Sequence, residues 1–518
     1  MSRNFLRATS VVGGMTLFSR ILGLVRDMVF SRLYGAGPLM DAFLVAFRIP
    51  NLGRRLFAEG AFSQAFVPVI SEFRSTRAHE EVRELADSVA GTLGLFLFLF
   101  TLAGVLAAPL LIYVFAPGFA DTPAQHDLTV AMLRLTFPYL FFISLTALAG
   151  GILNTYGRFG VPAFTPVLLN VVLIAFAIWI APRMQEPGIG LALGVFVAGL
   201  VQLLFQLPFL ARLRVLPRPR WGWPHEGVRR IGRLMLPALF GSSVAQLNIL
   251  IDTLIASLLA AGSISWLYYS DRLMEFPLGV FGIALATVIL PGLSRHHAEQ
   301  RPEVFSATLD WALRLSLLVG LPASVGLFVL AGPTIATLFQ YGEFSARDTG
   351  MASYSLMAYS LGLLGFIFVK VLAPGYFARQ DTRTPVRVGV IALVTNMGLN
   401  VVIVGPMVLL GLPAPHAGLA LATAASAFLN AGLLYRGLIR NGALRPAPGW
   451  RQLIVRAVAA NLAMGVALWW ARGSPEDWAA RGVGERAGWL TACILGGTLV
   501  YFAVLWLAGF RWSQLRRS

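Results

Sequence analysis

The chain has 518 residues, of which 57% are hydrophobic and only 13% are charged. A soluble domain carries roughly 25% charged residues, so this sequence cannot cover several soluble domains with solvated side chains. The formal net charge of +17 comes from 41 Lys and Arg against 24 Asp and Glu. These cations stand mostly between apolar segments, as in the cytoplasmic loops of membrane proteins, and do not suggest a nucleic-acid partner. One cysteine, Cys493, excludes an intrachain disulfide. We therefore predict an all-α polytopic membrane protein.

Long apolar segments recur along the chain. A helix needs about 20 mostly apolar residues to cross the hydrocarbon. This criterion predicts fourteen transmembrane helices, at residues 12–34, 41–70, 87–115, 128–156, 161–181, 188–211, 230–260, 265–294, 308–331, 350–376, 385–406, 416–438, 452–471 and 487–509. Arg residues gather at both termini and in alternate loops, which places both termini in the cytoplasm.

The longest cytoplasmic link, Arg212–Arg233, holds seven Arg and separates two similar halves. Its positive charge is that of an ordinary membrane anchor or, alternatively, of a surface that binds anionic lipid headgroups. Three pairs of motifs recur across this link at a nearly constant offset. The pairs are Phe66-Val-Pro68 with Ile289-Leu-Pro291, Ala108-Pro109 with Gly332-Pro333, and Leu169-Asn170 with Leu399-Asn400.

This repeat predicts the domain organisation. Residues 1–211 and 230–440 would form two six-helix lobes related as parallel repeats around a central cavity, as in transporters. Residues 212–229 would be the basic linker between the lobes. Residues 441–518 would add two further transmembrane helices and a cytoplasmic tail.

Three predicted spans carry charges that are costly in a membrane, at about 2.5–3.5 kcal/mol for each charge at the bilayer centre. Such residues persist only where they face water or one another. The charges are Arg20, Arg26 and Asp27 in the first span, Asp41, Arg48, Arg54, Arg55 and Glu59 in the second, and Asp271, Arg272 and Glu275 in the eighth. Ser19 lies seven residues before Arg26, and Ser265 seven before Arg272, so each serine shares a helix face with its arginine.

These charges predict a hydrated cavity walled by the first, second and eighth spans. Guanidinium groups bind phosphate with two oxygens at once, and the surplus of positive charge favours an anionic guest. Because 40 of the 41 basic residues are Arg, their position in the membrane carries more weight than their identity. The alternative is a set of structural ion pairs, since Asp271 and Arg272 both stand at contact spacing from Glu275 on one helix.

A separate carboxylate, Asp252, lies in the middle of the seventh span, with Asn248 one turn away and Thr253 adjacent. An isolated intramembrane carboxylate is by default a proton or cation site. Asp381 and Thr395 in the second half would contribute if the fold brings them near. This site would support Na⁺ or H⁺ coupling, with no other cofactor, and the alternative is a neutral structural aspartate.

The sequence contains no motif that is typical of an enzyme active site. Its single lysine, Lys370, precedes Val371, so there is no Walker lysine, and no HExxH metal motif is present. We predict that the protein is not an enzyme.

Several long motifs resemble one known family. They are Arg20-Ile-Leu-Gly-Leu-Val-Arg26-Asp27, the run from Pro50-Asn51 through Arg54-Arg55 and Glu59-Gly60 to Pro68, Tyr268-Tyr-Ser-Asp271-Arg272-Leu-Met-Glu275-Phe-Pro277 and Ala373-Pro-Gly-Tyr376. On these motifs the chain is similar, over its whole length, to the MurJ family of lipid II flippases. That family belongs to the multidrug/oligosaccharidyl-lipid/polysaccharide exporter superfamily.

The resemblance implies a site and a mechanism. The substrate would be lipid II, an undecaprenyl diphosphate that carries the peptidoglycan precursor, moved across the bacterial cytoplasmic membrane by alternating access. Membrane potential or an ion gradient would drive the cycle, and contacts with the cell-wall synthesis machinery are expected. The implied headgroup contacts are Arg20, Arg26, Arg54 and Arg272, with Ser19, Asp41 and Ser265 beside them. Asp27, Asp271 and Glu275 would pair with these cations, and Glu59 would lie near a gate.

The resemblance also implies that the two additional helices form a groove for the lipid tail. Two questions stay open at this point. The first is whether Arg54 or Arg55 contacts the headgroup, which spacing does not decide, and the second is the substrate. The alternative function is a cation-coupled exporter of another polyprenyl-linked saccharide or of a drug. A membrane-embedded transferase that acts on the same lipid would need a large outward loop, and the outward loops here are short.

Overall fold

The computed structural model describes residues 3–56 and 62–511, and within these ranges the regular structure is entirely helical. The all-α prediction is therefore confirmed. The chain's internal contacts group it into two compact units, Met1–Ile264 and Ser265–Ser518. The two units are described separately below.

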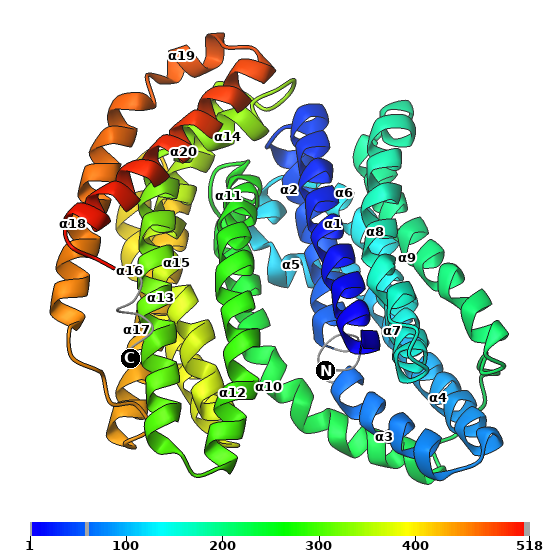
Figure 1. The fold of residues 1–518 in the computed structure, drawn as a ribbon. Coiled ribbons are helices and arrows are strands. Elements are labelled where there is room, and N and C mark those ends of the chain that lie inside the picture. The colour runs from blue at the N-terminus through cyan, green and yellow to red at the C-terminus, as the bar shows by residue number, and fades with distance from the viewer. Residues whose placement is uncertain (1–2, 57–61, 512–518) are drawn as a thin grey trace. The chain divides into compact units, whose positions relative to one another are not determined.

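The helices of the first unit include several that begin with proline at an early position, where its missing N–H costs no hydrogen bond. Pro38, Pro123 and Pro187 are examples. The unit contains α1 (Arg3–Tyr34), α2 (Pro38–Gly53), α3 (Ser63–Thr76), α4 (His79–Leu106), α5 (Ala108–Phe115), η2 (Pro117–Asp121), α6 (Pro123–Thr136), α7 (Tyr139–Thr155), α8 (Gly160–Ala175), η3 (Phe176–Ile180), η4 (Ala181–Arg183), α9 (Pro187–Arg212) and α10 (Glu226–Ser257) (Figure 1).

The helices of the second unit begin with α11, which starts two residues before the unit boundary. They are α11 (Ser263–Pro277), η5 (Leu278–Ile283), α12 (Ala284–Ala298), α13 (Pro302–Val329), α14 (Ala331–Leu338), α15 (Ala346–Phe377), α16 (Arg383–Leu409), α17 (Pro415–Arg440), α18 (Trp450–Ala471), α19 (Pro475–Ala480) and α20 (Val483–Leu507).

Eleven helices in the described part of the chain are long and apolar enough to cross a membrane. They correspond to the predicted spans three to six and eight to fourteen. The remaining predicted spans correspond to α1, to α2 with α3, and to α10. Helices α1 and α10 have 32 residues each, which exceeds the length that a span requires, and the count of fourteen stays a prediction.

Two pairs of helices at corresponding positions of the sequence repeat have equal lengths in the two units. Helix α4 has 28 residues and is followed by the eight-residue α5, and α13 has 28 residues and is followed by the eight-residue α14. The paired asparagines Asn170 and Asn400 are both buried, in α8 and α16. Pro68 and Pro291 both lie inside helices, α3 and α12.

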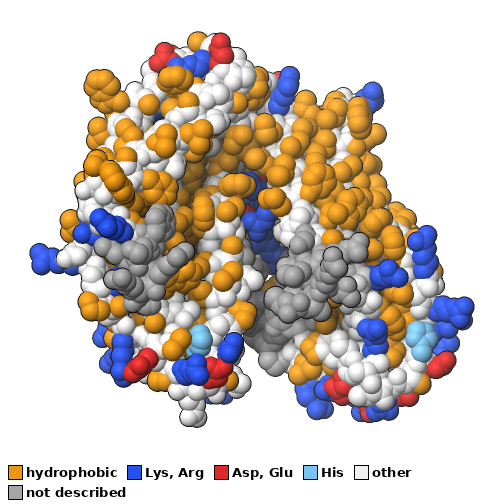
Figure 2. All heavy atoms as spheres, in the orientation of Figure 1, with side chains coloured by type: hydrophobic (Ala, Val, Ile, Leu, Met, Phe, Trp, Pro, Cys, Tyr) orange, Lys and Arg blue, Asp and Glu red, His pale blue; other side chains and the backbone are white. Residues whose placement is uncertain are grey.

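Each unit has its own apolar core and an apolar outer surface. In the first unit, Phe66 of α3, Leu85 of α4, Ile152 of α7 and Ile231 of α10 belong to one buried cluster. Figure 2 shows apolar side chains over the flanks of the helices of each unit, while charged side chains gather near the helix ends. An exposed apolar flank with charged ends is the pattern expected of spans in lipid.

The second unit attaches its two additional helices through a second buried cluster. This cluster joins Leu317 of α13, Ala457 of α18 and Leu505 of α20. The Tyr501 hydroxyl of α20 donates a hydrogen bond to the Leu318 carbonyl oxygen at 2.8 Å. Helix α18 thus packs against both α13 and α20 along one side of this unit (Figure 1).

The basic linker lies against α4 in the first unit. The Arg218 backbone N–H donates to Asp87 Oδ1 at 2.6 Å, and that of Arg220 donates to the Asp87 carbonyl oxygen at 3.1 Å. A Cβ on Gly91 would lie only 2.0 Å from the Arg220 carbonyl oxygen, so this approach requires glycine. The compact units group α10 with the first unit, and the lobe boundaries predicted from the repeat stay a prediction.

Candidate functional site

Two buried charges of the first unit form a cluster between α1 and α8. Arg26 and Asp27 are 4% and 0% exposed. The Arg26 guanidinium donates from Nη2 and Nε to Asp27 Oδ1, at 2.6 and 3.0 Å, and from Nη1 to Asn170 Oδ1 at 3.2 Å. Its carbon atom lies 5.6 Å from the centre of the Phe30 ring. A buried cation held this way has a counter-ion and an oriented donor fork.

Asn170 connects this cluster to the preceding turns of α1. Its Nδ2 donates to the backbone oxygen of Ser19 at 3.1 Å, while its Oδ1 accepts from Arg26. Ser19 is half-buried and Arg20 is exposed on the same helix. Sequence reasoning noticed Asn170 only as a partner of Asn400 in the repeat. A polar amide in an otherwise apolar span was the available signal for its role.

Asp41 lies at the start of α2 and binds a turn of the backbone. It is 2% exposed, and its Oδ2 accepts a hydrogen bond from the Gly262 N–H at 2.7 Å. Gly262 has φ of 97°, in the region that favours glycine, and directly precedes α11. Asp41 therefore ties α2 to the turn that follows α10.

The remaining cations of α2 reach different partners. Arg48 Nη1 donates to Thr253 Oγ1 of α10 at 2.7 Å, and Arg55, directly after α2, donates from Nη1 to Gln246 Oε1 at 3.5 Å. Arg54 instead donates from Nε to Asn51 Oδ1 within α2, at 2.7 Å. The predicted gate residue Glu59 lies outside the described residues.

In the second unit, the predicted residues lie on α11. Ser265 is fully buried and Asp271 is half-buried. Arg272 forms an ion pair with Glu275, with Nη1 and Oε2 3.3 Å apart, and its side chain is 36% exposed. Its guanidinium carbon lies 5.8 Å from the centre of the Tyr268 ring. The shared cavity of the first, second and eighth spans stays a prediction, because the first two belong to one unit and the eighth to the other.

The candidate cation ligands are also divided between the units. Asp252 accepts a hydrogen bond from Asn248 Nδ2 at 3.3 Å on α10, whereas Asp381 and Thr395 belong to the second unit. Both carboxylate oxygens of Asp381 bind Thr384 in the first turn of α16, Oδ1 at its backbone N–H and Oδ2 at its hydroxyl. These hydrogen bonds from Thr384 hold the pKa of Asp381 below its ordinary value. No cluster of three His, Cys, Asp or Glu side chains that could hold a metal occurs within the described residues.

Sequence analysis missed a second buried ion pair, which has a structural role. Arg314 Nε lies 2.7 Å from Asp310 Oδ2, one turn earlier on α13. Arg314 also donates to the carbonyl oxygens of Ala447 and Pro448, both at 2.9 Å, and Trp450 Nε1 donates to Asp310 Oδ1 at 2.7 Å. The pair thus holds the segment that leads into α18. Its i,i+4 spacing inside a predicted span was the available signal.

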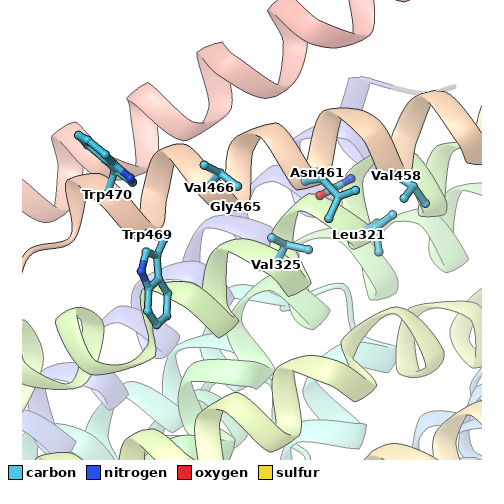
Figure 3. Close-up of a pocket in the computed structure, with 9 residues that line it drawn as sticks. Leu321, Val325, Val458, Asn461, Gly465, Val466, Trp469 and Trp470 are labelled. Atoms are coloured by element: carbon cyan, nitrogen blue, oxygen red, sulfur yellow. The ribbon is translucent and has the colours of Figure 1, made fainter.

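An apolar groove of about 470 Å³ lies between α13 and α18. Its lining residues are Leu321, Val325, Val458, Asn461, Leu462, Gly465, Val466, Trp469 and Trp470 (Figure 3). Helix α20 contributes no residue to this lining. The implied tail groove between the two additional helices therefore stays an expectation.

Comparisons with known proteins agree over nearly the whole chain. The family model "Lipid II flippase MurJ" matches residues 30–481. A probable lipid II flippase MurJ of Vibrio cholerae serotype O1 is 49% identical over 100% of this chain and 99% of its own length. The lipid II flippase MurJ of Burkholderia cenocepacia is 42% identical over 99% of each chain.

Solved structures give the same result at the level of the fold. A lipid II flippase MurJ in an inward closed conformation has a TM-score of 0.78 and 26% identity, over 95% of this chain and 97% of that one. An inward-facing transporter of the multidrug MATE family has a TM-score of 0.67 over 85% of this chain and 99% of that one. Its identity is 16%, so this likeness shows the fold alone.

Proposed function

This chain belongs to the MurJ family of lipid II flippases, and from that membership we propose how it moves lipid II from the inner to the outer leaflet of the bacterial cytoplasmic membrane. The flippase is a multi-pass membrane protein that acts by alternating access. An inward-open state takes up the headgroup while the tail stays in lipid, the lobes rock, and the outward-open state releases the headgroup. Both termini lie in the cytoplasm, as the positive loops indicate.

The observation that carries the proposal is the Arg26 cluster. A charged guanidinium 4% exposed inside an apolar helix is costly, and a purely structural role would be served as well by apolar packing. Phosphate oxygens match the geometry of the guanidinium fork. We propose that the headgroup diphosphate replaces Asp27 as the counter-ion of Arg26, while Asn170 keeps the guanidinium oriented. The exchange of one anion for another leaves the cation paired throughout the cycle.

The exposure and the hydrogen-bond partners of the other predicted contacts bear on their roles. The side chain of Arg272 is 36% exposed, and its ion pair with Glu275 is partly solvated, so exchange of this partner for a headgroup would cost little. Arg55 donates to Gln246 of α10 and Arg54 donates to Asn51 of α2, and both are kept as candidate headgroup contacts. Ser19, Arg20, Asp41 and Ser265 are proposed as neighbours of the headgroup.

The energy source of the cycle is a second part of the proposal. Movement of one charge through 100 mV supplies about 2.3 kcal/mol, and a Na⁺ or H⁺ gradient acting at Asp252 would supply a comparable driving force. We propose no catalytic site and no resident cofactor. Contacts with the cell-wall synthesis machinery would place lipid II near the enzymes that consume it.

The rival is a cation-coupled exporter of another polyprenyl-linked saccharide or of a drug. It would share the fold, as the MATE transporter does. Arg26 favours a phosphate-bearing substrate, since a cationic drug could not replace Asp27 as the counter-ion of the guanidinium.

The decisive test measures lipid II exposure on the outer leaflet of cells that are depleted of their own flippase and carry this chain. Arg26→Ala should abolish exposure at equal membrane level, because Asp27 and Asn170 lose their shared donor. Arg26→Lys keeps the charge but cannot bond both partners with a planar fork, so a partial loss is expected.

Arg295→Ala is the matched control, since Arg295 is exposed and pairs with Glu299. It should restore exposure like the wild type. If the wild type itself does not restore exposure while a drug-export assay responds to it, the rival function is correct. Full activity of Arg26→Ala would instead remove Arg26 from the headgroup site and leave the flippase assignment in place.

A further inference from the structure

The groove between α13 and α18 has the length of one membrane leaflet. Its lining runs along α18 from Val458 to Trp470 (Figure 3), which at 1.5 Å per residue spans about 18 Å. Half of a bilayer's hydrocarbon core is about 15 Å. Leu321 and Val325 of α13 form the opposite wall, one helical turn apart.

One of the residues that line the groove is a glycine, Gly465. A Cβ on Gly465 would lie 3.4 Å from a methyl carbon of Val325, so a longer side chain at this position would occupy the groove. Asn461 is the polar residue of the lining, and its Nδ2 donates to the Ala457 carbonyl oxygen at 2.7 Å within α18. The groove is therefore a slot with apolar walls that fits a hydrocarbon chain.

One end of the groove carries an aromatic and cationic rim. Trp469 and Trp470 lie at that end (Figure 3), in the position that tryptophan prefers at a membrane interface. The Arg472 guanidinium carbon lies 3.5 Å from the centre of the Trp469 ring, and its Nη1 donates to the Val329 carbonyl oxygen at 3.3 Å. Partial burial lowers the pKa of Arg472, which means that its charge is incompletely solvated.

Arg472 has no carboxylate counter-ion within residues 3–56 and 62–511. The carboxylate of Asp477 instead accepts from the Ser474 backbone N–H at 2.8 Å, as the cap of α19. At the opposite end of α18, Arg440 ends α17, Arg445 lies in the loop between the two helices, and Arg451 lies in the first turn of α18. In the orientation proposed above, the Trp470 end therefore meets the outer leaflet.

We propose that this groove binds one chain of an anionic phospholipid of the outer leaflet, whose phosphate contacts Arg472 beside Trp469. The length of the slot matches a chain of one leaflet, and a single guanidinium matches a single phosphate. The undecaprenyl chain of lipid II is far longer than the slot, and its diphosphate would call for more than one cation. This lipid is a resident partner and is distinct from the transported substrate.

The test uses the purified full-length chain in detergent and counts bound lipids by native mass spectrometry. The probes are phosphatidylglycerol, which is anionic, phosphatidylethanolamine, which is neutral overall, and undecaprenyl phosphate. The wild type should retain one phosphatidylglycerol more tightly than the other bound lipids. Arg472→Gln should weaken the binding of this phosphatidylglycerol about fivefold, the effect of one basic residue near a lipid surface. The binding of phosphatidylethanolamine should be unchanged.

Two further variants separate charge from shape. Arg472→Lys keeps the charge and should bind phosphatidylglycerol like the wild type. Gly465→Leu fills the slot and should lose the tightly held lipid whatever its headgroup, with circular dichroism and thermal unfolding as checks of folding. Equal phosphatidylglycerol retention by the wild type and Arg472→Gln would overturn the proposal. So would displacement of that lipid by undecaprenyl phosphate, which would assign the groove to the substrate's tail. Neither outcome depends on transport, so the flippase function stands apart from this test.

Discussion

Arg26 is held on three sides, by the Asp27 carboxylate, the Asn170 amide and the Phe30 ring. Each contact restricts a different degree of freedom, because the carboxylate neutralises the charge, the amide orients the fork and the ring covers its face. At the scale of the residue, this arrangement turns a flexible side chain into a preorganised donor. A headgroup that exchanges with Asp27 would then meet a guanidinium that is already in place.

Asn170→Leu tests that orientation. The substitution keeps a similar branched shape but removes the amide that accepts from Arg26 Nη1 and donates to the Ser19 carbonyl oxygen, and the loss of such a buried polar partner costs about 1–3 kcal/mol. We expect a lower midpoint of thermal unfolding and reduced lipid II exposure in depleted cells. Asn170→Gln retains the amide one methylene further out, and it should recover stability more than transport. Unchanged stability and transport in Asn170→Leu would contradict a positioning role.

The elements show how helices are joined by a few polar contacts within a largely apolar surface. Helix α2 reaches α10 through Arg48 and Thr253, and α2 reaches the turn before α11 through Asp41 and Gly262. Two contacts hold the linker between α17 and α18 to α13. Arg314 donates to the Ala447 carbonyl oxygen, and Trp450 donates to Asp310. Since apolar packing between helices in lipid is not directional, such contacts set which faces meet.

Asp310→Ala should therefore loosen the second unit at the segment before α18. Removal of one partner leaves Arg314 buried and uncompensated, at a cost of about 3–5 kcal/mol. We expect a lower thermal midpoint and faster proteolytic cleavage between residues 441 and 449, measured on the purified chain. Glu299→Ala removes a carboxylate that pairs with the exposed side chains of Arg295 and Arg301 and should leave both measurements near the wild type. Cleavage at the wild-type rate in Asp310→Ala would show that the clamp does not hold this segment.

The whole molecule consists of two compact units, each with its own core. The proposed transport cycle needs a driving force for the change between its inward-open and outward-open states. The candidate ion ligands Asp252 and Asp381 belong to different units. Asp381 also binds Thr384 at the start of α16, so its capping role and an ion-binding role predict different responses to substitution.

Charge removal at each aspartate distinguishes the two roles. The measurement is lipid II translocation in proteoliposomes under an imposed Na⁺ gradient, pH gradient or membrane potential. If Asp252 binds the coupling ion, Asp252→Asn should abolish the response to one ion gradient at unchanged protein stability. Asp381→Asn preserves a good helix cap and should retain transport if Asp381 is only a cap, whereas Asp381→Ala should lower stability by about 1 kcal/mol. An unaltered response of Asp252→Asn to all three gradients would exclude Asp252 as the coupling site.

Sequence alone was sufficient for the class of protein, for eleven of the spans and for the family, because these depend on local quantities. Mean apolarity over about 20 residues, the sign of loop charge and the motif around Arg26 can all be counted along the chain. The misfit of Arg26, Asp27 and Asp41 in apolar helices was visible in the same way, since a charge inside an apolar segment stands out in the sequence before its partner is known.

Only the tertiary structure decided which partners these residues have. The amide that orients Arg26 is Asn170, on another helix, and Arg48 meets Thr253 on α10. Neither partner has a fixed spacing from its arginine, because helix packing selects it. For the same reason, the structure reveals that both Asp381 oxygens serve the first turn of α16 and that Arg314 holds the segment before α18. Hydropathy and periodicity describe one helix at a time, whereas a site is formed where the faces of several helices meet.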